Sequence, residues 1–353
     1  MLLDTYLDNF FGMTEMKIPK TLSHPGSGWA LGFRSENQWN KTFNGLIKFN
    51  GPKVTSNTLF DLASLTKVVG TLPACFVLMQ EGSLNLDKTI NYYISNAGWF
   101  KDPSLGDVKI HNLLTHSSGL PAWKPLFAIS NIPSILHANV LQTEISNQGE
   151  RLYSDLGWMI LGHLIERISN RSLDQFIYEN VLKPLGMKRT FFNPISLNEK
   201  LNCAATEDCG WRKKILQGIV HDENAFAFGG VAGHAGLFSN LDDMIIYMES
   251  WLNNLEAIGL QNQASMVTQN IQSSKGFPAY GLGWRVYPSL EFSAAGNTEG
   301  SLGHTGYTGT SLWIKFDNQQ SIILLNNGVY PTRFVKEKSI NKFRKEIHQL
   351  CLD

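Results

Sequence analysis

A serine and a lysine three residues apart, Ser64 and Lys67, form the pattern in this chain best suited to nucleophilic catalysis. Residues three apart share one face of a helix, so the lysine amine can reach the serine hydroxyl. A partly desolvated amine loses its proton more easily and can accept one from the serine. Near a helix N-terminus, backbone N–H groups favour developing negative charge. The spacing therefore predicts an activated serine; the structural alternative is an N-cap serine.

The same spacing occurs again at Ser339 and Lys342, so the motif has to be interpreted in its context. The second copy lies in a predicted amphipathic helix near the end of the chain, whose apolar face runs from Ile340 to Leu350. Its serine and lysine are expected on the wet side of that helix. Apolar stretches at 59–63 and 68–79 flank the first copy, which indicates a buried helix that opens onto a cleft. Context therefore favours Ser64 as the nucleophile.

A tyrosine, Tyr153, precedes a predicted helix over 155–168. From such a loop it can project into a groove, and beside a lysine a phenol ionises more readily and can relay protons. The structural alternative is a tyrosine packed in the core. A rival Y-x-N pattern at 178–180 falls inside a predicted helix, where its residues point in different directions. We therefore favour Tyr153.

The third motif is His304-Thr305-Gly306, which leads into a predicted β-hairpin over 308–316 and 321–327. On an edge strand the glycine lets a substrate backbone lie close, and the next N–H can point at an oxyanion. Thr305 offers a hydroxyl, and His304 offers a donor or a charge that switches near neutral pH. The structural alternative for an isolated motif of this kind is a turn.

Together and in this order, the three motifs resemble those of the penicillin-recognising serine hydrolases: class C β-lactamases, low-molecular-weight penicillin-binding proteins and related esterases. The pattern in that family is S-x-x-K, then Y-x-N or a variant, then K-T-G or H-T-G. Three further phrases match it, namely LLTHSSGLP at 113–121, PLGM at 184–187 and GVAGHAGL at 230–237. The resemblance runs from about residue 26 to residue 330.

The resemblance implies a role for each matching residue. Ser64 would be the nucleophile that forms an acyl-enzyme, and Lys67 and Tyr153 would share the general-base and general-acid work. Which of these two takes the first proton stays open. The oxyanion hole would be the backbone N–H groups of Ser64 and Tyr307. Trp123 would line the pocket, and the polar segment 221–225 is given no role.

Two positions depart from the family's pattern: Asp155 stands where asparagine is frequent, and His304 where lysine is frequent. A carboxylate only accepts hydrogen bonds, so Asp155 is expected to pair with Lys67 and hold it charged, which weakens Lys67 as the first base. An imidazole in place of an ammonium removes a fixed anchor for a substrate carboxylate. We still expect Asp155, His304, Thr305 and Gly306 to contact the substrate.

These departures predict weak β-lactam turnover and better activity on esters, amides or D-Ala-type peptides. The leading prediction is a serine hydrolase that works through an acyl-enzyme on a small molecule or short peptide, without a cofactor or a metal. One alternative is a genuine class C-like β-lactamase. Another is a catalytically silent penicillin-binding or scaffold protein of the same fold. The oligomeric state stays open.

The composition agrees with a globular enzyme. Hydrophobic residues make up 43% and charged residues 17% of the 353 residues, which excludes a disordered chain. Lys plus Arg and Asp plus Glu each number 30, which argues against a nucleic-acid partner. The sequence contains no run of about 18 apolar residues, so no transmembrane helix is expected.

Neither a secretory signal nor a cysteine framework is visible. The first twenty residues lack the parts of a signal peptide, so we expect a cytoplasmic protein, or a periplasmic or extracellular one if a preceding segment has been removed. The four cysteines are few and irregularly spaced, which favours ordinary thiols over disulfides or structural zinc. They are Cys75, Cys203, Cys209 and Cys351.

Predicted strands lie near both ends of the chain and predicted helices between them. The strands are expected at 28–34, 43–49, 281–287, 308–316 and 321–327, and the helices at 64–81, 110–120, 155–168, 172–182, 241–254 and the end of the chain. The predicted fold is an α+β, or α/β sandwich, class: an antiparallel sheet from both chain termini, flanked by helices, with an inserted mostly helical lobe. By resemblance this is β-lactamase/transpeptidase-like. Residues 1–75 and 230–353 would form the sheet lobe and 76–229 the helical lobe, with the site in the groove between them.

Overall fold

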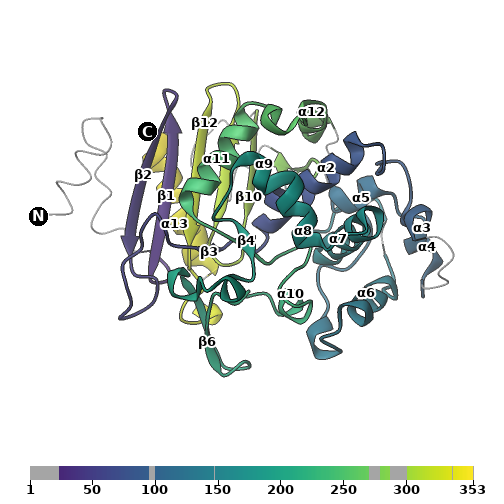
Figure 1. Ribbon diagram of the computed structural model, residues 1–353, viewed down its shortest axis with the longest axis horizontal. Helices are drawn as coiled ribbons and strands as arrows, with labels where there is room; N and C mark the ends of the chain where they lie inside the picture. Colours follow the sequence, from purple (N-terminus) through teal and green to yellow (C-terminus); the bar gives the residue numbers. More distant parts are fainter. Residues whose placement is uncertain are drawn as a thin grey trace, which may run out of the picture.

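One antiparallel sheet joins the two ends of the chain. The computed structural model describes residues 24–94, 100–146, 148–269, 279–286, 300–335 and 337–352. Within them, seven strands form a sheet in the order β2-β1-β12-β11-β10-β9-β8 (Figure 1). In that order they are Gln38–Gly45, Gly28–Ser35, Gln320–Asn326, Ser311–Lys315, Ser301–Thr305, Arg285–Val286 and Ala279–Tyr280. The prediction of an antiparallel sheet built from both ends is confirmed.

The second strand, β2, begins five residues earlier than the predicted strand over 43–49. Glu36 and Asn37 adopt φ of 47° and 62°, and two such residues make the tight turn that best matches strand twist. That turn pairs Ser35 with Gln38 and sets the register of the hairpin. The strand is polar and lies at the edge of the sheet, so the apolar pattern did not reveal its start.

Successive side chains of a strand point to opposite faces of the sheet, and a helix packs on each face. Trp29, Leu31 and Phe33 on β1 share a buried cluster with Phe343 and Ile347 of α13 (Glu337–Leu352). The residues between them point to the opposite face, where Ala30 belongs to the main core with α11 (Leu241–Leu252). Figure 1 shows the sheet between these two helices. The period of two is therefore what places one helix on each face.

Helices fill most of the chain between β2 and β10. Helix α7 is at their centre, and its residues from Leu156 to Leu161 are buried all round, as expected for a core helix. This region carries η1 (Lys67–Thr71), α2 (Leu72–Gln80), α3 (Ile90–Tyr93), α4 (Pro103–Gly106), α5 (Ile110–Leu114), η2 (Leu126–Ala128), α6 (Pro133–Leu141), α7 (Asp155–Ser169), α8 (Leu173–Ile177), η3 (Tyr178–Leu182) and α9 (Lys183–Leu185). The residue boundaries of the two lobes stay a prediction.

Shorter elements connect the helical region to the sheet. A small sheet joins β3 (Phe60–Asp61), β7 (Leu237–Ser239) and β4 (Phe191–Phe192), and a hairpin joins β5 (Ala205–Cys209) to β6 (Lys214–Gln217). The remaining helical elements are η4 (Pro194–Leu197), η5 (Lys200–Asn202), α10 (Glu223–Ala227), η6 (Glu256–Ile258), α12 (Gln261–Gln269) and η7 (Arg333–Val335).

Two further expectations concern membranes and thiols. Within the described ranges, none of the helices combines the length and the apolar character needed to cross a membrane. All four cysteines are free and buried.

Candidate active site

Ser64 lies at a strained turn between β3 and the first helix. Ala63, just before it, has a φ of +46°, a left-handed conformation that residues other than glycine seldom adopt. The Ala63 N–H donates to Asp61 Oδ1 at 2.8 Å, which holds this turn. A π-helical turn, η1, then begins at Lys67 and continues into α2, so the predicted helix over 64–81 contains a local widening. Such turns are frequent at functional sites.

Lys67 is fully buried and its amine connects three parts of the chain. Nζ donates to Ser64 Oγ at 3.0 Å and to the carbonyl of His234 at 3.1 Å, and it forms an ion pair with Asp155 Oδ1 at 2.7 Å. Burial alone would lower the pKa of Lys67, but Asp155 and then Tyr153 outweigh it and raise that pKa. The pairing with Asp155 is confirmed, and the raised pKa agrees with the expectation that Asp155 holds the amine charged.

Tyr153 lies beside this amine. Lys67 Nζ is 5.0 Å from the centre of its ring. On its other side the ring stacks on His116, with centroids 4.4 Å apart and planes at 26°. His116 Nδ1 accepts from the backbone N–H of Ser154 at 3.0 Å, so His116 positions both the loop and the phenol. Burial, and then the charges of Lys67 and two arginines, hold the pKa of His116 well below its usual range.

The motif at 304–306 lies at the end of β10, which is an internal strand. β10 pairs with β11 along its length and with β9 at Leu302 and Gly303. The prediction of an edge strand is therefore wrong for β10 as a whole. Because β9 ends its pairing at Gly303, His304 and Thr305 pair only with β11 among the described residues. Among the described residues, the backbone edge of His304 and Thr305 that faces β9 is therefore unpaired.

The turn after β10 packs directly on the residues that precede Ser64. Thr308 Oγ1 donates to the Asp61 carbonyl at 2.7 Å, and Thr310 Oγ1 to the Leu62 carbonyl at 3.2 Å. A Cβ on Gly306 would lie 2.1 Å from Thr310 Oγ1 and 2.6 Å from the Leu62 carbonyl oxygen. Only glycine fits there, and this close approach is what brings the 304–306 motif to Ser64.

Gly306→Ala is expected to cost about 1–3 kcal/mol of stability, because the added methyl overpacks this contact. It should also lower kcat on an ester substrate, because the 306–310 turn must move away from Ser64. Urea unfolding and ester kinetics measure the two effects. Gly210→Ala is the matched control, since a Cβ there meets nothing within 4 Å. Equal behaviour of the two variants would contradict the role of this contact.

His304 is buried and neutral. It is 1% exposed, its ring centre lies 6.2 Å from that of Tyr153, and Nδ1 lies 3.0 Å from the Thr305 carbonyl. Burial, followed by the charges of Lys67 and Arg285, holds the pKa of His304 well below its usual range. The expectation of a charge that switches near neutral pH is therefore wrong.

His304→Gln is expected to leave the shape of the pH–rate profile unchanged between about pH 6 and about pH 8, because an imidazole with a depressed pKa does not titrate there. The measurement is kcat/KM for an ester across that range, for both proteins. A titration limb present in the wild type and absent in the variant would show that His304 does change charge during turnover.

Two guanidinium groups lie beside Tyr280, whose ring contacts Tyr153. Arg285 Nε donates to Tyr280 Oη at 2.7 Å, and the Arg151 guanidinium lies 5.2 Å from the Tyr280 ring centre. Tyr280 in turn contacts His116 and Tyr153, with ring centres 5.0 and 6.0 Å apart. Sequence reasoning missed these residues and His116; of them only His116 lay inside a phrase of the family resemblance.

Trp123 lies next to the Asp155 backbone. The Asp155 N–H donates to the Ala122 carbonyl at 3.0 Å, so Trp123 follows directly after the paired residue. Its side chain is 45% exposed. Asn224 holds the loop after it, because Nδ2 donates to the Lys124 carbonyl and Oδ1 accepts from the Phe127 N–H. That Trp123 lines the pocket stays a prediction.

The segment 221–225, which was given no role, supports Lys67. Asp222 lies 2.8 Å from His234 Nε2, and the His234 carbonyl accepts from Lys67. The Asp222 carboxylate therefore anchors the residue whose backbone holds the lysine.

The two predicted oxyanion donors are the backbone N–H groups of Ser64 and Tyr307. No residue of the described chain accepts a hydrogen bond from the Ser64 N–H. Tyr307 follows Gly306, and its half-exposed ring stacks on His221, with centroids 5.6 Å apart. The roles of these two N–H groups stay a prediction.

The rival motifs lie elsewhere on the surface. Tyr178 is 49% exposed in the helical turn η3, and the side chain of Lys342 on α13 is 77% exposed.

A family model described as Beta-lactamase matches residues 21–345. A protein of Escherichia coli (strain K12) named "Putative D-alanyl-D-alanine carboxypeptidase" is 34% identical over an alignment of 337 residues that covers 86% of this chain and 77% of the relative. The structure of the Beta-Lactamase/D-Alanine Carboxypeptidase from Pseudomonas syringae matches with a TM-score of 0.72 at 20% identity, over 99% of both chains. The D-amino acid amidase from Ochrobactrum anthropi SV3 matches with a TM-score of 0.68 at 17% identity, over 92% of both chains. The solved structures confirm the predicted fold.

Proposed function

Because this chain belongs to the beta-lactamase family of serine hydrolases, we propose that it hydrolyses amide or ester bonds through an acyl-enzyme on Ser64. The observation that best supports this proposal is the 3.0 Å contact between Ser64 Oγ and the buried Lys67 amine. Ser64 Oγ attacks the carbonyl carbon, the leaving group departs with a proton, and water then releases the acyl group. The backbone N–H groups of Ser64 and Tyr307 would stabilise the oxyanion.

We assign the first proton transfer to Tyr153. The raised pKa of Lys67 keeps its amine protonated, since its pairing with Asp155 outweighs the effect of burial. A protonated amine donates and cannot accept. In this step Tyr153 reacts as the phenolate: it takes the Ser64 proton, becomes the phenol and returns the proton to the leaving group, while Lys67 holds Ser64 Oγ and the Tyr153 oxygen together. His116 positions the phenol from the opposite face of the ring.

The proposed substrate is a peptide that ends in D-alanine, or a related D-amino-acid amide. The Escherichia coli relative carries a D-alanyl-D-alanine carboxypeptidase name, and one solved neighbour is a D-amino acid amidase. A terminal carboxylate needs a cation, which the neutral His304 does not supply. Arg285 is the proposed substitute, because it pairs opposite Gly303 on β9 and its charge acts on His304.

The substrate class is tested with a D-Ala-D-Ala peptide and its C-terminal amide. Arg285→Gln is expected to raise KM for the free acid by about 10-fold or more, because it removes a charge-assisted hydrogen bond, and to leave KM for the amide within about 2-fold. Arg171→Gln is the matched control, because this arginine is exposed and paired with Glu179. Equal effects of Arg285→Gln on both substrates would remove Arg285 from carboxylate recognition.

A β-lactamase is the competing function within the family. Nitrocefin hydrolysis at the rates of dedicated enzymes, roughly 10–10³ per second, together with no turnover of the peptide, would favour it over the peptidase.

A further inference from the structure

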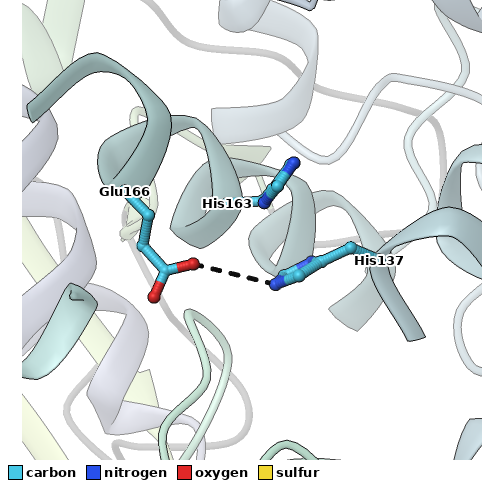
Figure 2. Close-up of side chains that lie close together, drawn as sticks. All are labelled: His137, His163 and Glu166. Atoms are coloured by element: carbon cyan, nitrogen blue, oxygen red, sulfur yellow. Dashed lines mark ion pairs between the residues drawn. The ribbon is translucent and has the colours of Figure 1, made fainter. Parts of the chain in front are cut away.

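Two histidines and a glutamate meet away from Ser64, between helices α6 and α7. His137 comes from α6, and His163 and Glu166 come from one face of α7, three residues apart (Figure 2). One ligand atom from each side chain lies within 4.8 Å of the other two. His137 Nε2 and Glu166 Oε2 are 3.8 Å apart, and the two imidazole rings stack with centroids 4.2 Å apart. None of these residues has a part in the proposed acyl transfer.

The three side chains have the chemistry of zinc ligands. Two imidazoles and one carboxylate form a donor set that Zn²⁺ accepts, with the fourth position left for water. Ligating histidines have to be neutral. Burial lowers the pKa of His137 to about 3 and that of His163 to about 4, with smaller contributions from neighbouring charges. Among the described residues His163 Nδ1 is buried without a hydrogen-bond partner. Burial also raises the pKa of Glu166, a cost that a bound cation would offset.

The surroundings orient the carboxylate and leave room for a further ligand. The Leu173 N–H donates to Glu166 Oε1 at 3.1 Å, which leaves Oε2 directed at His137. Such supporting hydrogen bonds are usual around metal ligands. A cavity of about 190 Å³ borders His137 and Glu166, and Asp174 lies on its wall. A water molecule on the metal would occupy this cavity.

We propose that His137, His163 and Glu166 bind one Zn²⁺ ion that ties α6 to α7. The side chains must draw in, because ligand atoms around a tetrahedral zinc ion lie roughly 3.3–3.5 Å apart. The irregularly spaced cysteines indicated no structural zinc, but that argument does not cover a site made of two histidines and a glutamate from two helices. Helix α6 follows the loop after Trp123, and α7 begins at Asp155. The ion would therefore connect α6 to α7, the helix that begins beside Lys67 at Asp155. The ion itself would not contact the reacting atoms.

The test uses the full chain, freed of metal with a chelator and then titrated with ZnCl₂ and with CoCl₂. The proposal predicts one bound Zn²⁺ per chain by elemental analysis after gel filtration, a visible absorption band on Co²⁺ binding, and a higher Tm with Zn²⁺. Zinc affinity should fall by roughly 100-fold or more in His163→Ala and in Glu166→Gln. Glu166→Gln keeps the size of the side chain, so it stays informative if His163→Ala fails to fold.

Two controls separate this site from the catalytic one. His111→Ala changes a half-buried histidine outside the cluster and should bind zinc like the wild type. Ser64→Ala should do the same, whatever its effect on hydrolysis. The proposal is overturned if the metal-free wild type binds no stoichiometric Zn²⁺ or Co²⁺, or if Glu166→Gln binds either ion as tightly as the wild type.

Discussion

Ser64→Ala is expected to lower kcat for an ester substrate by roughly 10⁴-fold to 10⁶-fold, the range seen when the nucleophile of a serine hydrolase is removed. The variant should also lose all labelling by a fluorophosphonate probe. Its Tm should stay close to that of the wild type, because the change deletes one hydroxyl whose partner is Lys67 Nζ at 3.0 Å. Lys67 keeps its ion pair with Asp155 in the variant.

The matched control is Ser339→Ala, the serine of the second S-x-x-K copy, on the exposed side of α13. It should keep full labelling and full kcat. If labelling persisted in Ser64→Ala, another residue would be the nucleophile, and the proposed function would fail. Loss of labelling in both variants would point to an effect on folding and not on chemistry.

Lys67→Met is expected to damage both catalysis and stability. Turnover should fall by about 10³-fold or more, because the amine no longer holds Ser64 Oγ and Tyr153 together. Stability should fall by about 3–5 kcal/mol, because the variant leaves a largely buried Asp155 without its counter-ion. The Asp155 side chain is 18% exposed in the wild type. Urea unfolding and ester kinetics give the two quantities.

The double variant Lys67→Met/Asp155→Asn separates the two effects. It removes the stranded charge, so most of the lost stability should return, while activity should stay as low as in Lys67→Met. The pKa of Lys67 is raised in the folded chain. The ion pair therefore contributes its full stabilisation free energy below about pH 10, the pKa of lysine in the unfolded chain. That contribution is lost only as the pH rises above this value toward the folded pKa. The stability difference between wild type and Lys67→Met should therefore be the same at about pH 7 and about pH 9.

The amino-acid pattern determined which side chains meet locally. Ser64 and Lys67 share a helix face because three residues make nearly one turn, and their contact follows from that spacing. Alternation along β1 likewise determined which residues face α13. The predicted close approach of a substrate backbone at Gly306 stays a prediction, and the close approach to the Leu62 carbonyl became known only from the fold.

The tertiary structure decided the charge states and the distant neighbours. The family motifs indicated a crevice, but the raised pKa of Lys67 and the lowered pKa of His304 depend on burial and on groups far along the chain. The internal position of β10, the guanidinium of Arg285 and the cluster at His137 also arise from elements that meet only on folding. Local spacing is a property of the chain itself, whereas desolvation and electrostatic coupling act through space. For this reason the sequence alone could name candidate reacting groups and the Asp155 partner of Lys67, but not the charge state of His304.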